Sequence, residues 1–165
     1  AFGCPYEGEI PESRLRGVVG MAVRARPAVI TLADTIGAAA PTDVRARVAG
    51  ARDAAPATPI ACHFHNTRNT GLANAFAAVQ AGVPTLDASL GGIGGCPFAP
   101  GATGNIPTED LLYMLHRSGL ATGISLDAAI ETAAWLQARL GRTVPGMLLK
   151  AGPFPRTTPS PGKIA

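Results

Sequence analysis

Short apolar runs alternate along this chain with longer segments in which apolar residues recur every three or four positions. The short runs are rich in β-branched residues and predict strands at 28–33, 59–66 and 83–89, with the end of another strand at 1–3. The longer segments predict helices after Pro11, over 41–55 and 70–81, and after residues 108 and 125. In the first helix, the spacing places four apolar residues on one face: Leu15, Val18, Val19 and Ala22.

Residues typical of helix ends stand at the expected boundaries. Thr108 and Ser125 precede helical segments and are expected to cap them. Gly82 and Gly141 follow helical segments, in the place where a left-handed residue often ends a helix. These boundaries make the strand–helix alternation regular, and such alternation implies a parallel sheet.

Polar residues gather where the predicted strands end. Asp34 and Thr35 follow one strand, His63 to Asn66 close the next, and Asp87 and Ser89 close a third. Both doubly wound sheets and β/α barrels place functional groups at the carboxyl ends of their strands. Asp87 and Ser89 share a face and are expected either to support a site there or to form a hydrogen-bonded layer.

Composition narrows the function classes. The chain has 165 residues, 47% of them hydrophobic and 15% charged, which is typical of one globular domain. The net charge of +3 is spread without a block of lysine or arginine, so no nucleic-acid or membrane partner is expected. An odd number of cysteines, three without CxxC spacing, indicates reduced thiols and a bacterial cytoplasm; a mitochondrial matrix also fits.

The most informative feature is the pair His63 and His65. Alternate residues of a strand share a face, so both imidazoles point one way while Cys62 and Phe64 point the other way. Imidazole is the commonest protein ligand for divalent transition metals, and two neighbouring rings form half of such a site. The alternative interpretation is two histidines hydrogen-bonded in a polar pocket.

A glycine-rich loop at 91–105 is the second candidate for chemistry. Cys96 stands within it, and Asn105 ends it directly before a helix. A flexible linker and a phosphate cradle are the alternatives, but neither accounts for a single cysteine followed by this asparagine. A thiol on a mobile loop can be brought to a substrate and withdrawn.

Five motifs together resemble those of hydroxymethylglutaryl-CoA lyase, a metal-dependent lyase of the β/α-barrel metallolyase superfamily. They are Gly3-Cys4-Pro5-Tyr6-Glu7-Gly8, Leu32-Ala33-Asp34-Thr35-Ile36-Gly37, His63-Phe64-His65-Asn66-Thr67, Gly94-Gly95-Cys96-Pro97-Phe98-Ala99 and Thr103-Gly104-Asn105-Ile106-Pro107-Thr108-Glu109-Asp110. The resemblance implies a parallel β/α (TIM-type) barrel of which this chain holds about the C-terminal half. Residues 1–150 would form that half. Independently of the resemblance, the Pro, Gly, Ser and Thr content of 151–165, with few apolar residues, predicts a disordered tail.

The resemblance also implies a metal site. His63 and His65 would ligate a divalent ion, Mg²⁺ or Mn²⁺, with Asn105 in or near the coordination shell. The substrate would be a coenzyme A thioester: hydroxymethylglutaryl-CoA would be cleaved to acetyl-CoA and acetoacetate.

Catalytic roles follow from the same resemblance. Cys96 matches a loop cysteine that assists proton transfer, Asp34 a carboxylate at the rim of the site that is implicated in acid/base work, and Glu109 a position that supports the loop. His63 would serve both the metal and the reaction.

Part of the family's site is absent from this sequence. Family members carry an Arg-Asp pair on the first strand, where Asp ligates the metal, and a catalytic Glu on the next strand. We therefore expect this polypeptide alone to be inactive, to bind metal weakly and to form a homo-oligomer or depend on the other half. The alternatives are a related acyl-CoA lyase, an acyltransferase like isopropylmalate or citramalate synthase, and a half-barrel without catalytic activity.

Overall fold

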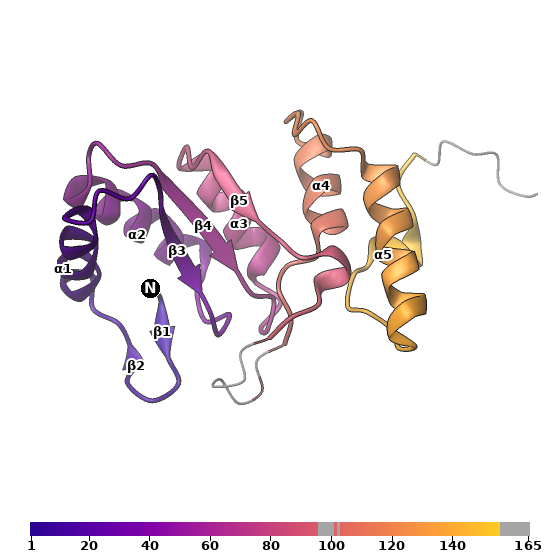
Figure 1. Ribbon diagram of the computed structural model, residues 1–165, viewed down its shortest axis with the longest axis horizontal. Coiled ribbons are helices and arrows are strands. Elements are labelled where there is room, and N and C mark those ends of the chain that lie inside the picture. Colours follow the sequence, from indigo (N-terminus) through magenta and orange to yellow (C-terminus); the bar gives the residue numbers. More distant parts are fainter. Residues whose placement is uncertain (96–100, 102, 156–165) are drawn as a thin grey trace, which may run out of the picture.

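The computed structural model describes residues 1–95, 101 and 103–155 (Figure 1). Its elements follow one another in this order: β1 (Gly3–Cys4), β2 (Gly8–Glu9), α1 (Glu12–Val23), β3 (Ile30–Asp34), α2 (Pro41–Ala54), β4 (Ile60–Phe64), α3 (Gly71–Gln80), β5 (Thr85–Asp87), η1 (Leu90–Gly92), α4 (Thr108–Arg117), α5 (Leu126–Leu140) and α6 (Leu148–Ala151). The predicted α/β alternation is confirmed. Within these residues, no helix has both the length and the apolar character needed to cross a bilayer.

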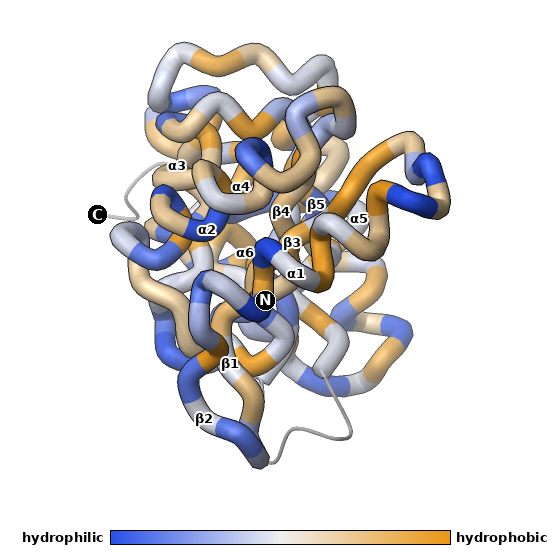
Figure 2. The backbone as a smooth tube through the Cα atoms, turned by 90° about the vertical axis from the view of Figure 1, so that its left-hand side faces the viewer, coloured by the Kyte–Doolittle hydropathy of each residue, from blue (hydrophilic) through white to orange (hydrophobic). Residues whose placement is uncertain are grey.

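The central sheet has three parallel strands in the order β3-β4-β5. The strand end predicted at residues 1–3 is found only in part: Gly3 begins β1, but β1 pairs antiparallel with β2 in a separate hairpin. This hairpin protrudes from the body at the lower end of Figure 2, with hydrophilic residues at its tip. An ion pair between Glu7 and Arg14 joins it to α1, and the nitrogen of Ala1 donates to the carbonyl of Ala33 at 3.0 Å.

Register divides the sheet into two chemically different faces. Leu32, Cys62 and Leu86 lie side by side across the three strands, and the first two are almost fully buried. The next row, Ala33, His63 and Asp87, points to the opposite face because side chains alternate along each strand. One face is therefore apolar and packed, and the other carries the polar chemistry.

The helices α1 to α4 supply the other half of the core. Their buried side chains join those of the strands in one cluster that includes Leu15, Val19, Val44, Val48, Ala75, Ala78, Leu111 and Leu115. The predicted apolar face of α1 is only partly correct, since Val18 is 51% exposed while Leu15 and Val19 are buried. Val18 lies about 100° around the helix from Val19, beyond the stripe that meets the core.

Most of the predicted helix ends are confirmed. The Ser125 hydroxyl accepts a hydrogen bond from the Ala128 amide at 3.2 Å, and Gly141 ends α5 with a φ of 62°. Gly82 follows α3 with a φ of 76°. The expected cap at Thr108 was wrong: Pro107 is the capping residue, and the Thr108 amide donates to the carbonyl of Ser89 at 2.9 Å.

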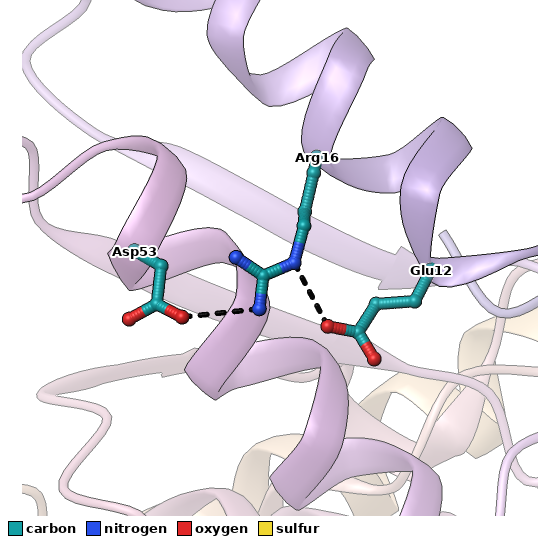
Figure 3. A network of polar contacts seen from close by, with 3 residues as sticks. All are labelled: Glu12, Arg16 and Asp53. Atoms are coloured by element: carbon teal, nitrogen blue, oxygen red, sulfur yellow. Dashed lines mark hydrogen bonds and ion pairs between the residues drawn. The ribbon is translucent and has the colours of Figure 1, made fainter.

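A polar network on the surface links α1 to α2 (Figure 3). Arg16 donates from Nε to Glu12 at 2.9 Å, one turn away in α1, and from its terminal nitrogen to Asp53 of α2 at 3.0 Å. All three side chains are well exposed, so water screens these pairs and they contribute little to stability.

The buried ring of Phe64 is expected to be central to folding. It is fully buried between the two histidines along the chain and packs against the ring of Phe2 at 6.1 Å between centroids. Phe64→Ala should lower the free energy of unfolding by about 3–5 kcal/mol, because it leaves a cavity in the core. Urea titration followed by circular dichroism measures this change.

The matched control is Phe154→Ala, which removes the same ring from a site that is 68% exposed. Its ring meets only the guanidinium of Arg117 at 5.8 Å among the ring contacts found in the described residues, so a loss below about 1 kcal/mol is expected. Equal losses for both variants would contradict this account of the core.

Candidate functional site

The two histidines project from the polar face of the sheet, at the carboxyl end of its middle strand. His63 lies in β4 and His65 directly after it, and their ring centroids are 5.1 Å apart with an angle of 67° between the rings. The prediction that both imidazoles share a face is confirmed. His65 is 5% exposed and His63 is half-buried, so both rings are partly withdrawn from water.

Each ring is held through its Nδ1 atom. The Nδ1 of His63 contacts a carboxylate oxygen of Asp87, and the Nδ1 of His65 lies 3.1 Å from the carbonyl oxygen of Thr103. Both partners accept hydrogen bonds and cannot donate them, so each Nδ1 carries the proton. In a neutral ring the lone pair is then on Nε2, which leaves that nitrogen able to bind a metal.

Asn105 adds an oxygen to this group. It forms an isolated antiparallel bridge with His65, and directly paired residues of such a bridge present their side chains on the same face. Its Nδ2 donates to the carbonyl of Ile93 at 3.0 Å. Its Oδ1 is buried and has no hydrogen-bond partner among the described residues, which is costly unless something else binds there.

These observations fit a divalent metal ion only in part. Two imidazole nitrogens and an amide oxygen are suitable ligands, and the unpaired Oδ1 of Asn105 is the atom that an ion would satisfy. Mg²⁺ and Mn²⁺ prefer carboxylate oxygen, however. Across residues 1–95, 101 and 103–155 there is no group of three or more His, Cys, Asp or Glu side chains that could hold a metal. The described residues could therefore supply only part of a coordination shell.

The described ends of the glycine-rich loop meet beside the histidines. The amide of Asn66 donates to the carbonyl of Gly104 at 3.1 Å, so the end of the loop runs antiparallel to the continuation of β4. A Cβ atom on Gly104 would lie 1.7 Å from the carbonyl oxygen of Gly92, so only glycine fits where the two ends of the loop cross. Cys96, the predicted catalytic thiol, lies outside the described residues.

Glu109 anchors the start of the glycine-rich loop through a hydrogen bond to its main chain. It is fully buried at the beginning of α4, and its Oε2 accepts a hydrogen bond from the Gly91 amide at 3.0 Å. Its Oε1 has no partner among the described residues and lies against Gly146, where a Cβ atom would come within 2.0 Å. Burial raises the pKa of this carboxyl. These contacts tie Glu109 to the start of the loop, and the supporting and catalytic roles named for it stay predictions.

Asp34 is not brought together with the histidines. It lies in register with Phe64, hence on the packed face of the sheet, and it is fully buried. Its two oxygens accept hydrogen bonds from the amides of Ala38 at 2.9 Å and Ala39 at 3.0 Å. Its role in acid/base work stays a prediction, and these contacts favour positioning of the loop after β3. The sequence held a signal for this placement: Asp34 follows the apolar Leu32 by two residues, and residues two apart in a strand share a face.

Sequence reasoning missed two contacts near the site. The carbonyl of Thr103 orients His65, and the carboxylate of Asp110 accepts hydrogen bonds from the amides of Met147 and Leu148 at 2.8–3.1 Å. A main-chain carbonyl leaves no mark in the sequence. Asp110 beside Glu109 was visible, but its partners lie nearly 40 residues away.

Cys62 is a core residue, as its alternation away from the two imidazoles along the strand predicts. It is fully buried, and loss of contact with water raises the pKa of its thiol to about 12. A protonated, inaccessible thiol is neither nucleophile nor metal ligand. Cys62 therefore does not belong to the site.

Comparison with known proteins points to one family. The model of the HMGL-like family matches residues 1–136. The chain is 50% identical over 153 residues to (R)-citramalyl-CoA lyase of Chloroflexus aurantiacus, covering 93% of this chain and 48% of that protein. It is 39% identical to a hydroxymethylglutaryl-CoA lyase of Bacillus subtilis, covering 90% of this chain and 50% of that protein.

A solved structure agrees over the same part of the fold. An HMG-CoA lyase from Acinetobacter baumannii, in complex with coenzyme A and 3-methylmalate, superposes with a TM-score of 0.90 at 45% identity. The match covers 97% of this chain and 52% of that one. The chain thus spans about half the length of the relatives it matches.

Two substitutions test the support that Glu109 gives to the loop. Glu109→Ala should lower the free energy of unfolding by about 1–3 kcal/mol, because the buried Gly91 amide loses its acceptor. Glu109→Gln keeps an acceptor oxygen and should lose less. Urea titrations of both variants beside the parent measure the difference, and Glu131→Gln on the exposed face of α5 is the control.

The raised pKa of Glu109 adds a dependence on pH. The folded state holds this proton more tightly than the unfolded chain, whose glutamate titrates near about 4.3. The resulting stability is present below that pH and is lost as the pH rises through the folded pKa. The parent should therefore lose stability relative to Glu109→Gln on going from pH 4 upward. Parallel curves for the two proteins would contradict a raised pKa.

Proposed function

The chain belongs to the HMGL-like family, and on that premise we propose that it forms the metal-binding half of a carbon–carbon lyase acting on an acyl-CoA. The observation that carries the proposal is the pair of imidazoles with both Nδ1 atoms held, beside the unpaired Oδ1 of Asn105. The named relatives are lyases of hydroxymethylglutaryl-CoA and citramalyl-CoA, and this supports the reaction class.

In this proposal His63, His65 and Asn105 hold a divalent ion, Mg²⁺ or Mn²⁺. The ion would polarise the tertiary hydroxyl of the substrate and orient the bond to be cut. The remaining ligand is expected to be a carboxylate on the other half of the barrel. Apolar grooves of about 430 Å³ and 600 Å³ run beside β3 and β5, the two outer strands, and they support the packing of further barrel elements at these edges.

The reaction needs protons moved at two places. The hydroxyl must lose its proton as the carbon–carbon bond breaks, and the methylene carbon of the leaving acetyl-CoA enolate must gain one. Cys96 is proposed as the acid at that carbon. Glu109 supports it indirectly, because it anchors Gly91 at the start of the loop that carries the thiol. His63 has its Nδ1 on Asp87 and its Nε2 for the ion, so its part in the reaction would be to hold the ion that binds the hydroxyl.

Two substrates are candidates. Hydroxymethylglutaryl-CoA and citramalyl-CoA both carry a methyl and a hydroxyl on the carbon that is released, but the first has one more methylene before its free carboxylate. Cleavage gives acetyl-CoA with acetoacetate from the first and with pyruvate from the second. Citramalyl-CoA is added to hydroxymethylglutaryl-CoA as a candidate because the chain is 50% identical to the citramalyl-CoA lyase and 39% identical to the hydroxymethylglutaryl-CoA lyase of Bacillus subtilis. One methylene in a pocket is worth about 10–200-fold in kcat/KM.

A direct assay tests the reaction. The chain is assayed with both thioesters and Mg²⁺ or Mn²⁺, alone and joined to a first half-barrel of the family, and the oxo-acid product is identified. The joined protein should cleave at least one of the two thioesters and lose activity with EDTA, because the ion is part of the site. The chain alone should be inactive, because the shell lacks its carboxylate.

Two results would contradict the proposal. If the joined protein folds but cleaves neither thioester, the chain does not have the proposed lyase function. Cleavage that survives complete removal of metal would show that the paired imidazoles serve another purpose.

The thiol has its own test. Cys96→Ala in the joined protein should lower kcat by about 10²–10⁴, the usual contribution of a general acid. Cys4→Ala, which removes a partly buried thiol next to the turn of the hairpin, is the control and should leave kcat nearly unchanged. Unchanged turnover in Cys96→Ala would exclude the thiol as the acid.

A further inference from the structure

Asp87 closes β5 on the polar face of the sheet, where its carboxylate meets the Nδ1 of His63. We infer that Asp87 is a positioning residue that fixes the tautomer of His63 and so presents its Nε2 lone pair to the metal. The inference rests on the metal site of the proposed function. It assigns a role to a residue outside the predicted catalytic and metal-binding set.

The sheet itself sets this contact. His63 and Asp87 are register partners on neighbouring parallel strands, so their side chains stand side by side on one face. The packed face holds the register, because Leu86 lies beside Cys62 and both pack with Phe64 in the core. The position of the carboxylate is therefore determined by strand pairing, and it does not depend on the glycine-rich loop.

The exposure of Asp87 argues against a purely structural role. Its side chain is 59% exposed, whereas that of His63 is 25% exposed. A carboxylate so accessible to water does not need a partner to be stable, and its removal leaves no cavity in the core. The ring of His63, by contrast, depends on Asp87, because the acceptor at Nδ1 decides the orientation of the ring and which of its two nitrogens carries the proton.

The two histidines are oriented by different means. His65 uses the carbonyl of Thr103, a main-chain group that no substitution removes, whereas His63 uses a side chain. Carboxylates in this position commonly raise the basicity of the ligating nitrogen, and their loss costs about 10–100-fold in metal affinity. Of the two groups that orient the imidazoles, only the side chain of Asp87 can therefore be removed by substitution.

The first experiment reads the tautomer directly and needs neither metal nor turnover. The protein is labelled with ¹⁵N-histidine, and long-range ¹H–¹⁵N correlation spectra are recorded at pH 8 for the parent, Asp87→Ala and Thr85→Ala. Thr85 is exposed and lies two residues earlier on the same face of β5, so it is the matched control. The parent and the control should carry the His63 proton on Nδ1, and Asp87→Ala should shift it to Nε2.

The second experiment measures Mn²⁺ affinity by electron paramagnetic resonance in the joined protein. Asp87→Ala should bind Mn²⁺ about 10–100-fold more weakly than the parent and Thr85→Ala. Equal affinity in Asp87→Ala and the parent would overturn the role of Asp87 and leave the proposed function standing. Failure of the parent itself to bind Mn²⁺ would overturn the metal site, and with it the proposed function.

The spectra can also overturn the inference by themselves. A His63 ring of the parent that carries its proton on Nε2, or on both nitrogens at pH 8, would show that Asp87 does not set the neutral tautomer. The same tautomer in the parent and in Asp87→Ala would show that another group sets it.

Discussion

The parallel register of β3, β4 and β5 is the constraint on which the site depends. It places Leu32, Cys62 and Leu86 in one row and Ala33, His63 and Asp87 in the next, so one face of the sheet builds the core and the other the chemistry. Burial of the first row holds the second in place. A slip by one residue would exchange the two faces and turn the imidazoles into the core.

The sequence predicted those parts of the fold that depend on local periodicity. Alternation along 59–66 gave the common face of the two imidazoles, and Ser125 and Gly141 marked the ends of α5. The hairpin was not foreseen, because two-residue strands carry no periodic pattern. The cap at Thr108 was wrong because Pro107 takes that place and the threonine amide donates to the carbonyl of Ser89, which lies between β5 and η1.

The residues of the candidate site could be predicted from the sequence better than their geometry. His63, His65 and Asn105 could be named from the sequence, and the bridge between His65 and Asn105 now gives them a shared face. Asp34 was placed at the rim, although its two-residue spacing from the buried Leu32 puts it on the packed face. The carbonyl of Thr103 could not be foreseen, because contacts made by the main chain follow from tertiary structure alone.

The central claim is that a divalent ion binds between the two imidazoles on the polar face, and a titration with Mn²⁺ tests it most directly. Paramagnetic broadening of the histidine ring resonances is followed in the joined protein, with His116 as the internal reference because its ring is engaged with Thr122 beyond α4. The account predicts that the signals of His63 and His65 broaden together at Mn²⁺ concentrations that leave His116 sharp. Equal broadening of all three rings, or none, would contradict it.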